Sequence, residues 1–220
     1  DGSIAEISGN SLKWVANWVA AKKGRQLAPG AVVRVQATGS KPVWRLAQLP
    51  EVEVALVAVN PNNGAITALL GGFDFNRNKF NRVTQAWRQP GSSFKPFIYS
   101  AALEKGYTPA TIINDAPMSL TAEEAGGTAW EPQNYDGTTS GPVRMRSALT
   151  KSLNLVSVRI LQGIGPYYAR DYIRRFGFEP ARHPPYLTMA LGAGSVTPLQ
   201  MAAAYGVFAN GGFSVKPYLI

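Results

Sequence analysis

The period of the hydrophobic pattern changes along the chain, and this change restricts the fold more than any other feature. Within residues 52–58, apolar side chains alternate with others, which is typical of a strand with one buried face. The segment 60–64 (NPNNG) is typical of a turn, and 65–70 again has strand character. From 149 to 160, leucine, valine and isoleucine instead recur every three or four positions, as on one face of a helix. The chain is therefore expected to be α/β in the broad sense (α+β), with a mostly antiparallel sheet that begins with a hairpin over 51–70 and is covered by helices.

Other segments carry the signals that start and stop helices. A helix-like run follows the segment 89–96 and ends at Gly106. Thr197 followed by Pro198 is a typical helix N-terminus. Residues 114–142, in contrast, are rich in loop formers, and a stretch of this length in a compact domain is commonly functional or mobile. The further helices that the sequence predicts are 145–162, 167–176 and 198–210.

Residues 1–50 differ in character from the rest of the chain. They carry seven basic side chains against two acidic ones, in a chain with a net charge of +9, and they predict a short helix at 11–21 and strands at 31–37 and 42–49. An excess of positive charge attracts anionic partners, but no stacking pattern of aromatic residues accompanies it, so nucleic acid is not expected as a partner. We interpret 1–50 as a linker or the end of a preceding β-rich insertion, and 51–220 as a separate domain.

The composition narrows the chemistry that the chain can perform. It holds no cysteine and a single histidine, His183, which excludes disulfides and thiolate nucleophiles and argues against a histidine-cluster metal site. Hydrophobic residues make up 45% of the chain and charged residues 16%, which favours a globular fold over a disordered one. Nucleophilic catalysis by this chain would therefore use a hydroxyl group, with lysine as the candidate base.

Ser92 and Lys95 are the candidates for this chemistry. They follow a Pro-Gly break and precede a helical run, and a spacing of three residues places their side chains on one face of the first helical turn. Lysine acts as a base near neutral pH only when desolvation or a second cation lowers its pKa. Ser93 lacks the three-residue spacing to Lys95, so Ser92 is the expected nucleophile. The alternative is that Ser92 is an ordinary helix N-cap.

Ser152 and Asn154 are a second pair of candidates. In an unbroken helix, residues two positions apart point in directions that differ by about 200°, so this pair can serve one site only if the helix is interrupted there. The sequence therefore predicts a short connection between two helices near these residues, with Leu153 turned inward. Ser152 would then relay a proton between Lys95 and a leaving amine, and the Asn154 amide would hold a substrate carbonyl. The alternative is a continuous helix with two polar residues facing solvent.

The segments around these motifs resemble a known family. They are 89–96 (QPGSSFKP), 130–135 (WEPQNY), 150–154 (TKSLN), 191–194 (LGAG) and 197–200 (TPLQ). In order and approximate spacing they are similar to the transpeptidase domain of class A penicillin-binding proteins, of the 1a type of Gram-negative bacteria. The resemblance extends from about Val52 to the end of the chain. It implies the penicillin-binding protein/serine β-lactamase-like fold, here incomplete.

The resemblance also implies a reaction and its residues. Ser92 would be the acylated nucleophile and Lys95 its base, and Ser152 and Asn154 would form the second motif of a DD-transpeptidase. In that reaction the serine attacks the penultimate D-Ala carbonyl of a peptidoglycan stem peptide, D-Ala leaves, and an amine of a neighbouring stem peptide resolves the acyl-enzyme. β-Lactams mimic the D-Ala-D-Ala end and are expected to bind Ser92 covalently. No metal or organic cofactor is implied.

Two further residues and several partners follow from the same resemblance. Trp130 and Asn134 are expected near the cleft as substrate-binding residues, with core packing as the alternative for Trp130. The third motif of the family, Lys-Thr/Ser-Gly, does not occur in this chain, so the remainder of the same domain is expected to supply it. We expect the parent protein to carry a glycosyltransferase domain and to act on the periplasmic side of the bacterial inner membrane, which it would contact only through an anchor outside this chain.

Two other functions share these motifs. A serine β-lactamase or a DD-carboxypeptidase would send water, instead of an amine, to the acyl-enzyme, and the lifetime of the penicillin adduct separates a β-lactamase from a transpeptidase. A non-catalytic sensor or wall-binding domain would keep the fold but would form no covalent adduct on Ser92.

Overall fold

The computed structural model describes residues 34–38, 43–47 and 52–219, and the chain divides into two units, 1–53 and 54–220. In the first unit, β1 (Arg34–Thr38) pairs antiparallel with β2 (Val43–Ala47). Strand β2 falls within the predicted segment 42–49, and β1 extends one residue beyond the predicted segment 31–37. The helix predicted at 11–21 lies outside the described residues.

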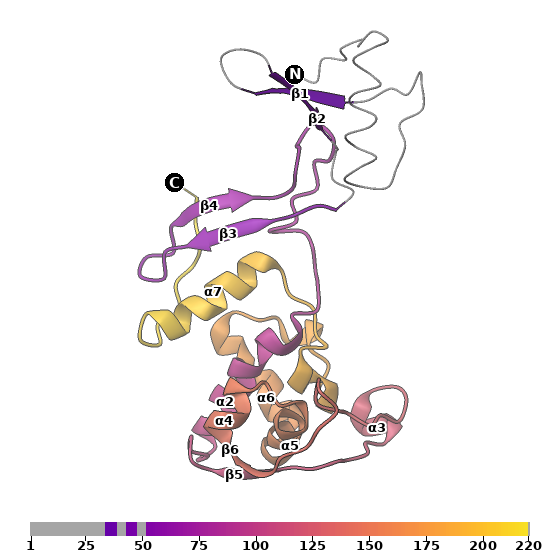
Figure 1. Ribbon diagram of the computed structural model, residues 1–220. Coiled ribbons are helices and arrows are strands. Elements are labelled where there is room, and N and C mark those ends of the chain that lie inside the picture. The colour runs from indigo at the N-terminus through magenta and orange to yellow at the C-terminus, as the bar shows by residue number, and fades with distance from the viewer. Residues whose placement is uncertain (1–33, 39–42, 48–51, 220) are drawn as a thin grey trace, which may run out of the picture. The chain divides into compact units, whose positions relative to one another are not determined.

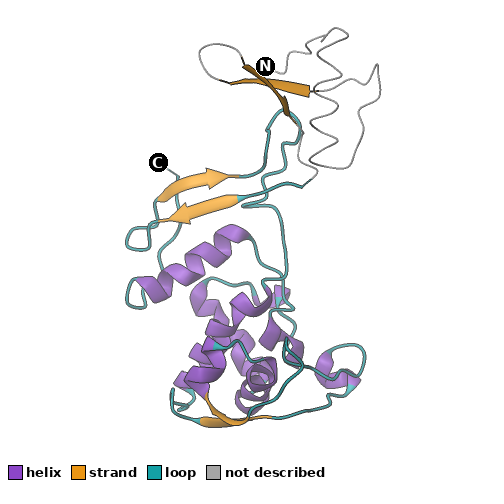
Figure 2. Ribbon diagram, viewed as in Figure 1, coloured by secondary structure: helices purple, strands orange, loops and turns teal. Residues whose placement is uncertain are grey.

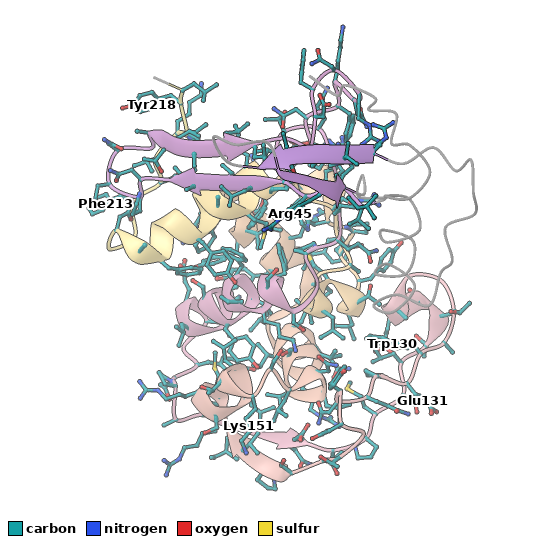
Figure 3. All side chains as sticks on the ribbon, turned by 45° about the horizontal axis from the view of Figure 1, so that its top comes forward. Arg45, Trp130, Glu131, Lys151, Phe213 and Tyr218 are labelled. Carbon is teal, nitrogen blue, oxygen red and sulfur yellow. The ribbon has the colours of Figure 1, made fainter. Side chains whose placement is uncertain are left out.

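The second unit begins with the predicted hairpin. Strand β3 (Leu56–Val59) pairs antiparallel with β4 (Ile66–Leu70), and Gly64 in the connecting turn has a φ of +82°, a left-handed conformation that favours glycine. The hairpin prediction is confirmed, with paired strands shorter than the alternating pattern suggests. Tyr218, labelled in Figure 3, forms a parallel bridge with Ala65 at the start of β4. The end of the described chain thus returns to the hairpin.

A cluster of helices forms the core of the second unit. Helix α5 (Asn154–Ile164) contacts α2 (Lys95–Glu104), α4 (Met145–Thr150) and α6 (Pro166–Tyr172), and Figures 1 and 2 show that helices make up most of this region. The buried face of α5 includes Val156, Ile160 and Leu161, which have no exposed area, and α2 buries Phe97 and Ile98 against the same core. The helix that follows Ser92 is therefore largely buried. The α-helices are α2 (Lys95–Glu104), α3 (Ala122–Ala125), α4 (Met145–Thr150), α5 (Asn154–Ile164), α6 (Pro166–Tyr172) and α7 (Pro198–Ala209), and the 3₁₀ turns are η1 (Gly91–Phe94), η2 (Ile173–Phe176), η3 (Pro180–Arg182) and η4 (Leu187–Leu191).

The predicted helices agree with these bounds, with two refinements. The segment 145–162 is divided into α4 and α5, and the segment 167–176 becomes α6 followed by the tighter turn η2. Helix α7 begins as expected: the Thr197 hydroxyl accepts a hydrogen bond from the Gln200 amide, and the Gln200 side chain accepts one from the Thr197 amide. This reciprocal capping satisfies amide groups that the first helical turn leaves unpaired.

The segment 114–142 contains more regular structure than the sequence predicts. Its two ends pair as β5 (Ile112–Asp115) and β6 (Gly141–Arg144). In the part of the chain between these strands, Leu120 and Trp130 form an antiparallel bridge with each other. The prediction of a loop for these ends is therefore wrong. Half of the paired positions are occupied by residues that are rare in strands, namely Asn114, Asp115, Gly141 and Pro142. Tertiary packing therefore overrides the local preference.

In the ranges described, none of the helices has both the length and the apolarity that a membrane crossing requires.

Candidate active site

Ser92 lies on the 3₁₀ turn η1, which runs directly into α2. Gly91 at the start of this turn has a φ of +59°, and Ser92 is exposed to solvent. The hydroxyl of Ser93 donates a 2.6 Å hydrogen bond to the carbonyl of Pro90, whereas within the described chain the Ser92 hydroxyl has no hydrogen-bond partner. As an early residue of the turn, Ser92 also has a backbone N–H with no partner inside the helix. Ser92 is thus the serine of this pair whose oxygen is available to a substrate.

Residues of α7 and of the segment 191–194 contact the turn η1 and the residues beside it. From α7, the Tyr205 hydroxyl donates a 2.7 Å hydrogen bond to the carbonyl of Ser93. The Gln89 side chain donates to the carbonyl of Ala193, and the Cα of Gly192 faces the backbone of Gly91 so closely that a side chain at 192 would overlap it. The LGAG segment at 191–194, which the sequence singles out by resemblance alone, therefore supports the backbone that carries Ser92.

Lys95, the first residue of α2, is almost completely buried, with 1% of its surface exposed. Its Nζ donates three hydrogen bonds, to the Ser152 carbonyl at 2.6 Å, the Ser152 hydroxyl at 3.0 Å and the Asn154 Oδ1 at 2.7 Å. Burial lowers the pKa of Lys95 from 10.5 to about 8. With this pKa about a tenth of the amine is neutral at pH 7, far more than at the usual pKa of 10.5, and only the neutral form acts as a base.

Ser152 and Asn154 meet at Lys95 because the chain turns sharply between α4 and α5. Ser152 has a φ of +54° and is the one residue other than glycine with a left-handed backbone among those described. Such a conformation costs about 1–2 kcal/mol in a residue with a Cβ, and it is retained where the surrounding structure enforces it. Leu153 next to it is buried. The predicted interruption, with Leu153 turned inward, is confirmed.

The side-chain amide of Asn154 is held in one orientation. Its Nδ2 donates a 2.8 Å hydrogen bond to the carbonyl of Gln133, which turns Oδ1 toward Lys95. Nδ2 carries a second hydrogen, so the amide keeps one donor for a substrate carbonyl. The backbone N–H of Asn154 donates to Oδ1 of Asn134 at 2.8 Å, which pairs one of the free amides at the N-terminus of α5.

Asn134 is buried, and its polar atoms bind within the protein. Its Nδ2 donates to both oxygens of Asp115, at 2.9 and 3.1 Å, and to the carbonyl of Thr138 at 2.8 Å. The structure therefore places Asn134 behind the second motif. Asp115 is a member of the site region that the sequence reasoning missed, because a single aspartate in a polar segment gives no local signal of burial.

Trp130 lies on the segment between α3 and β6, next to Glu131 (Figure 3). Its backbone exchanges two hydrogen bonds with Leu120, and its half-buried side chain packs against the hydrophobic core. These contacts agree with the packing alternative for Trp130. A substrate contact by its remaining exposed surface stays a prediction.

Two hollows border these residues. One of about 400 Å³ lies against the turn of Ser92 and is lined by Pro90, Ser93 and Tyr205 among others. Another of about 530 Å³ lies beside Gln133 and Asn134, the residues that bind Asn154. Both volumes are in the range of small-molecule sites.

His183 is buried behind the nucleophile turn and does not serve as its base. Its ring stacks on Phe94 at a centroid distance of 4.9 Å and lies edge-on to Phe178. Neither ring nitrogen has a hydrogen-bond partner among the described residues, and burial lowers the pKa of His183 from 6.5 to about 4, so the ring is neutral. In the part of the chain that the structure covers, no three acidic or histidine side chains converge in a way that would hold a metal ion.

Two family models match the chain. The model described as "Penicillin binding protein transpeptidase domain" matches residues 54–220, and the one described as "Penicillin-binding protein OB-like domain" matches residues 1–52. The junction between the two matches lies at the division of the structure into two units.

Curated relatives agree with these matches. The chain is 54% identical over 191 residues to penicillin-binding protein 1A of Neisseria lactamica, which covers 87% of this chain and 24% of the relative. It is 48% identical over 221 residues to penicillin-binding protein 1A of Neisseria cinerea, which covers 100% of this chain and 27% of the relative. The chain thus spans about a quarter of the length of these relatives.

Solved structures show the same fold. The crystal structure of penicillin-binding protein 1A from Haemophilus influenzae superimposes with a TM-score of 0.77 at 42% identity, over 84% of this chain and 27% of that one. The PonA1 protein from Mycobacterium tuberculosis in complex with penicillin V superimposes with a TM-score of 0.65 at 28% identity, over 74% of this chain and 45% of that one. These comparisons confirm the α/β fold class and the penicillin-binding resemblance that the sequence motifs indicate.

Proposed function

Since the chain belongs to the penicillin-binding protein transpeptidase family, we propose that it supplies the nucleophile and the base of a peptidoglycan DD-transpeptidase, the covalent target of β-lactam antibiotics. The observation that carries this proposal is the arrangement around Lys95. A buried amine with a lowered pKa follows an exposed serine by three residues and contacts the hydroxyl of Ser152 and the amide of Asn154. This set of groups suits acyl transfer through a serine ester.

The proposed reaction has two steps, acylation of Ser92 and transfer of the acyl group to an amine. Neutral Lys95 accepts the proton of the Ser92 hydroxyl while the serine oxygen attacks the carbonyl carbon of the penultimate D-Ala of a stem peptide. The backbone N–H of Ser92 stabilises the oxygen that becomes negative. The C–N bond then breaks, and the Ser152 hydroxyl relays the proton from Lys95 to the departing D-Ala amine. An amine of a neighbouring stem peptide then attacks the ester carbonyl carbon and forms the new amide bond. Lys95 accepts the amine proton through the Ser152 hydroxyl and gives a proton to the Ser92 oxygen as the bond from the acyl carbon to that oxygen breaks, which restores Ser92.

The partners follow from the same proposal. The Asn154 amide holds a carbonyl of the substrate through its free N–H, and the remainder of the domain supplies the Lys-Thr/Ser-Gly motif that this chain does not contain. Stem peptides and β-lactams are the ligands. The parent protein acts on the periplasmic side of the bacterial inner membrane and carries a glycosyltransferase domain in addition.

Intact-protein mass spectrometry tests the proposal. The protein that contains this chain together with the rest of the domain is incubated with benzylpenicillin, alongside Ser92→Ala and the matched control Ser93→Ala. One covalent equivalent is expected on the wild type and on Ser93→Ala, and none on Ser92→Ala. The Ser93 hydroxyl is already bound to Pro90, so its loss removes a turn contact and leaves the nucleophile in place.

The other outcomes separate the alternatives. An adduct that forms and is released within minutes indicates a serine β-lactamase, because water then resolves the acyl-enzyme. Absence of any adduct on the wild type contradicts the enzyme proposal and favours a non-catalytic sensor or wall-binding domain.

A further inference from the structure

Asp115 is a fully buried carboxylate at the end of β5, and none of its described contacts is with a cation. Its relative exposure is 0%, and among the described residues no lysine, arginine or histidine forms a salt bridge with it. Burying a charge without a cation is costly unless several hydrogen bonds stabilise it. Such a group calls for an explanation beyond packing, since a neutral side chain of the same size would avoid this cost.

The hydrogen bonds of Asp115 come from two donors. Both carboxylate oxygens accept from Nδ2 of Asn134, at 2.9 and 3.1 Å, and one of them also accepts from the backbone N–H of Ser140 at 2.9 Å. Because both oxygens face donors, the amide of Asn134 can point only its NH₂ group toward Asp115. Its oxygen must then point the opposite way, toward the N-terminus of α5.

A continuous set of hydrogen bonds connects this carboxylate to the candidate base. Asn134 Oδ1 accepts from the backbone N–H of Asn154 at 2.8 Å and lies 3.4 Å from that of Leu155. The Asn154 side chain, held on its other side by Gln133, accepts from Lys95 at 2.7 Å. Three hydrogen bonds therefore lead from Asp115 to the Lys95 amine. The first orients the Asn134 amide, the second fixes the backbone of Asn154, and the third uses the Asn154 side chain, which Gln133 orients.

We propose that Asp115 is a positioning residue for acyl transfer at Ser92: by orienting Asn134 it fixes the start of α5, and with it the Asn154 oxygen that holds Lys95. This proposal rests on the proposed function, because it assigns Asp115 a part in the same site. Asn134, expected from the sequence to bind substrate, acts here as the link between Asp115 and Asn154. Neither residue touches the reacting atoms.

With Asn134 as its partner, this role requires a carboxylate at position 115, because both of its oxygens accept hydrogen bonds. In an Asp115→Asn variant, one of the two oxygens becomes an NH₂ group that faces Asn134 Nδ2 or the Ser140 N–H, so two donors oppose each other. The Asn134 amide is then free to turn over, which would present its NH₂ group to the N–H of Asn154. Combining Asp115→Asn with Asn134→Asp restores one donor opposite an acceptor between residues 115 and 134, and it keeps an acceptor for the N–H groups of Asn154 and Ser140. The bonds from residue 134 to the second oxygen of residue 115 and to the Thr138 carbonyl are lost.

The experiment compares acylation by a fluorescent penicillin in the intact protein and four variants: Asp115→Asn, Asn134→Asp, the double variant, and Asp136→Asn as a control. Asp136 is an exposed aspartate in the neighbouring turn that accepts a hydrogen bond from the Thr138 amide, which an asparagine oxygen also accepts. Rate constants are expressed per active molecule, so that partial unfolding lowers the amount of reactive protein and leaves the constant unchanged.

At a pH where Lys95 is neutral, the acylation rate constant of Asp115→Asn and of Asn134→Asp is expected to be about tenfold lower than that of the wild type. A loss of this size corresponds to one misplaced hydrogen bond. The double variant is expected to recover most of this loss, and Asp136→Asn to react like the wild type. A rate constant for Asp115→Asn within about twofold of the wild type overturns the proposal. A double variant as slow as the product of the two single effects overturns it as well.

Hydrogen exchange provides a readout that does not depend on penicillin. Exchange of the Asn154 backbone amide is expected to be faster in Asp115→Asn than in the wild type, and slow again in the double variant, because this N–H binds Asn134. Unchanged protection of Asn154 in Asp115→Asn overturns the positioning role even if every protein reacts with penicillin. A wild type that shows the expected exchange pattern but no adduct would count against the proposed function alone.

Discussion

The Nζ of Lys95 donates a 2.7 Å hydrogen bond to the Oδ1 of Asn154, although the two residues are 59 positions apart in the chain. This contact joins the start of α2 to the start of α5 and brings the two sequence motifs into one site. The same amine also binds the carbonyl and the hydroxyl of Ser152. The protonated amine donates to all three acceptors, and burial lowers its pKa, so that it loses a proton more readily than an exposed lysine.

The rate of acylation is expected to rise with pH through about 8. Burial lowers the pKa of Lys95 to about 8, and only the neutral amine accepts the Ser92 proton, so the protonated form below this pH is inactive. Second-order rate constants for a fluorescent penicillin, measured between pH 6 and 9.5, check this directly. A rate that is constant over the whole range would exclude Lys95 as the base.

Two replacements of Ser152 separate the effect of its backbone conformation from the effect of its hydroxyl. Ser152→Gly and Ser152→Ala both delete the hydroxyl, but only glycine adopts the φ of +54° without strain. We expect the glycine variant to be more stable than the alanine variant by about 1 kcal/mol, and both to be acylated equally slowly. Denaturant unfolding and acylation rates of the two variants provide the test. If the glycine variant regains the wild-type rate, the hydroxyl has no part in acylation.

Gly192→Ala is expected to slow acylation because it disturbs the turn that carries Ser92. A Cβ at 192 overlaps the backbone of Gly91, and the φ of +73° adds strain. Gly177 is the matched control, since its φ is +86° and a Cβ there meets nothing within 4 Å. Both variants should lose about 1 kcal/mol of stability from backbone strain, and only Gly192→Ala should also react more slowly per active molecule. Equal rates in the two variants would show that the 191–194 segment does not position the nucleophile.

His183 is expected to make the fold sensitive to acid. In the unfolded chain its pKa is near 6.5, whereas burial lowers it to about 4 in the fold, so the unfolded state binds more protons between these values. Stability therefore falls as the pH is lowered from 6.5 to 4, by up to about 3 kcal/mol from this group.

His183→Leu should lose this part of the pH dependence, since the chain contains no other histidine. Unfolding free energies of the two proteins at pH 7 and pH 4.5 provide the comparison. The carboxylates titrate in both proteins. The difference between the two proteins in how far the unfolding free energy falls from pH 7 to pH 4.5 therefore reports His183. Parallel slopes would show that the imidazole is solvated or paired in solution.

The elements that could be predicted from the sequence are those with a strong local signal. The hairpin at β3 and β4, the capped start of α7 and the break between α4 and α5 all follow from periodicity, turn residues or the spacing of two polar side chains. The pairing of β5 with β6 could not be predicted, because half of its residues are asparagine, aspartate, glycine or proline, which are rare in strands, and their partners are distant in sequence.

The sequence by itself determined the chemical groups and the family: a serine and a lysine three residues apart, a second serine and asparagine, and no cysteine that would offer another nucleophile. The tertiary structure alone decided how these groups act. It buried Lys95, which lowers the pKa of its amine, engaged Ser93 and left Ser92 exposed, and placed Asp115 and Asn134 behind Asn154. Burial and hydrogen-bond direction depend on segments that are far apart in the chain and meet only in the fold, and no local pattern of residues encodes them.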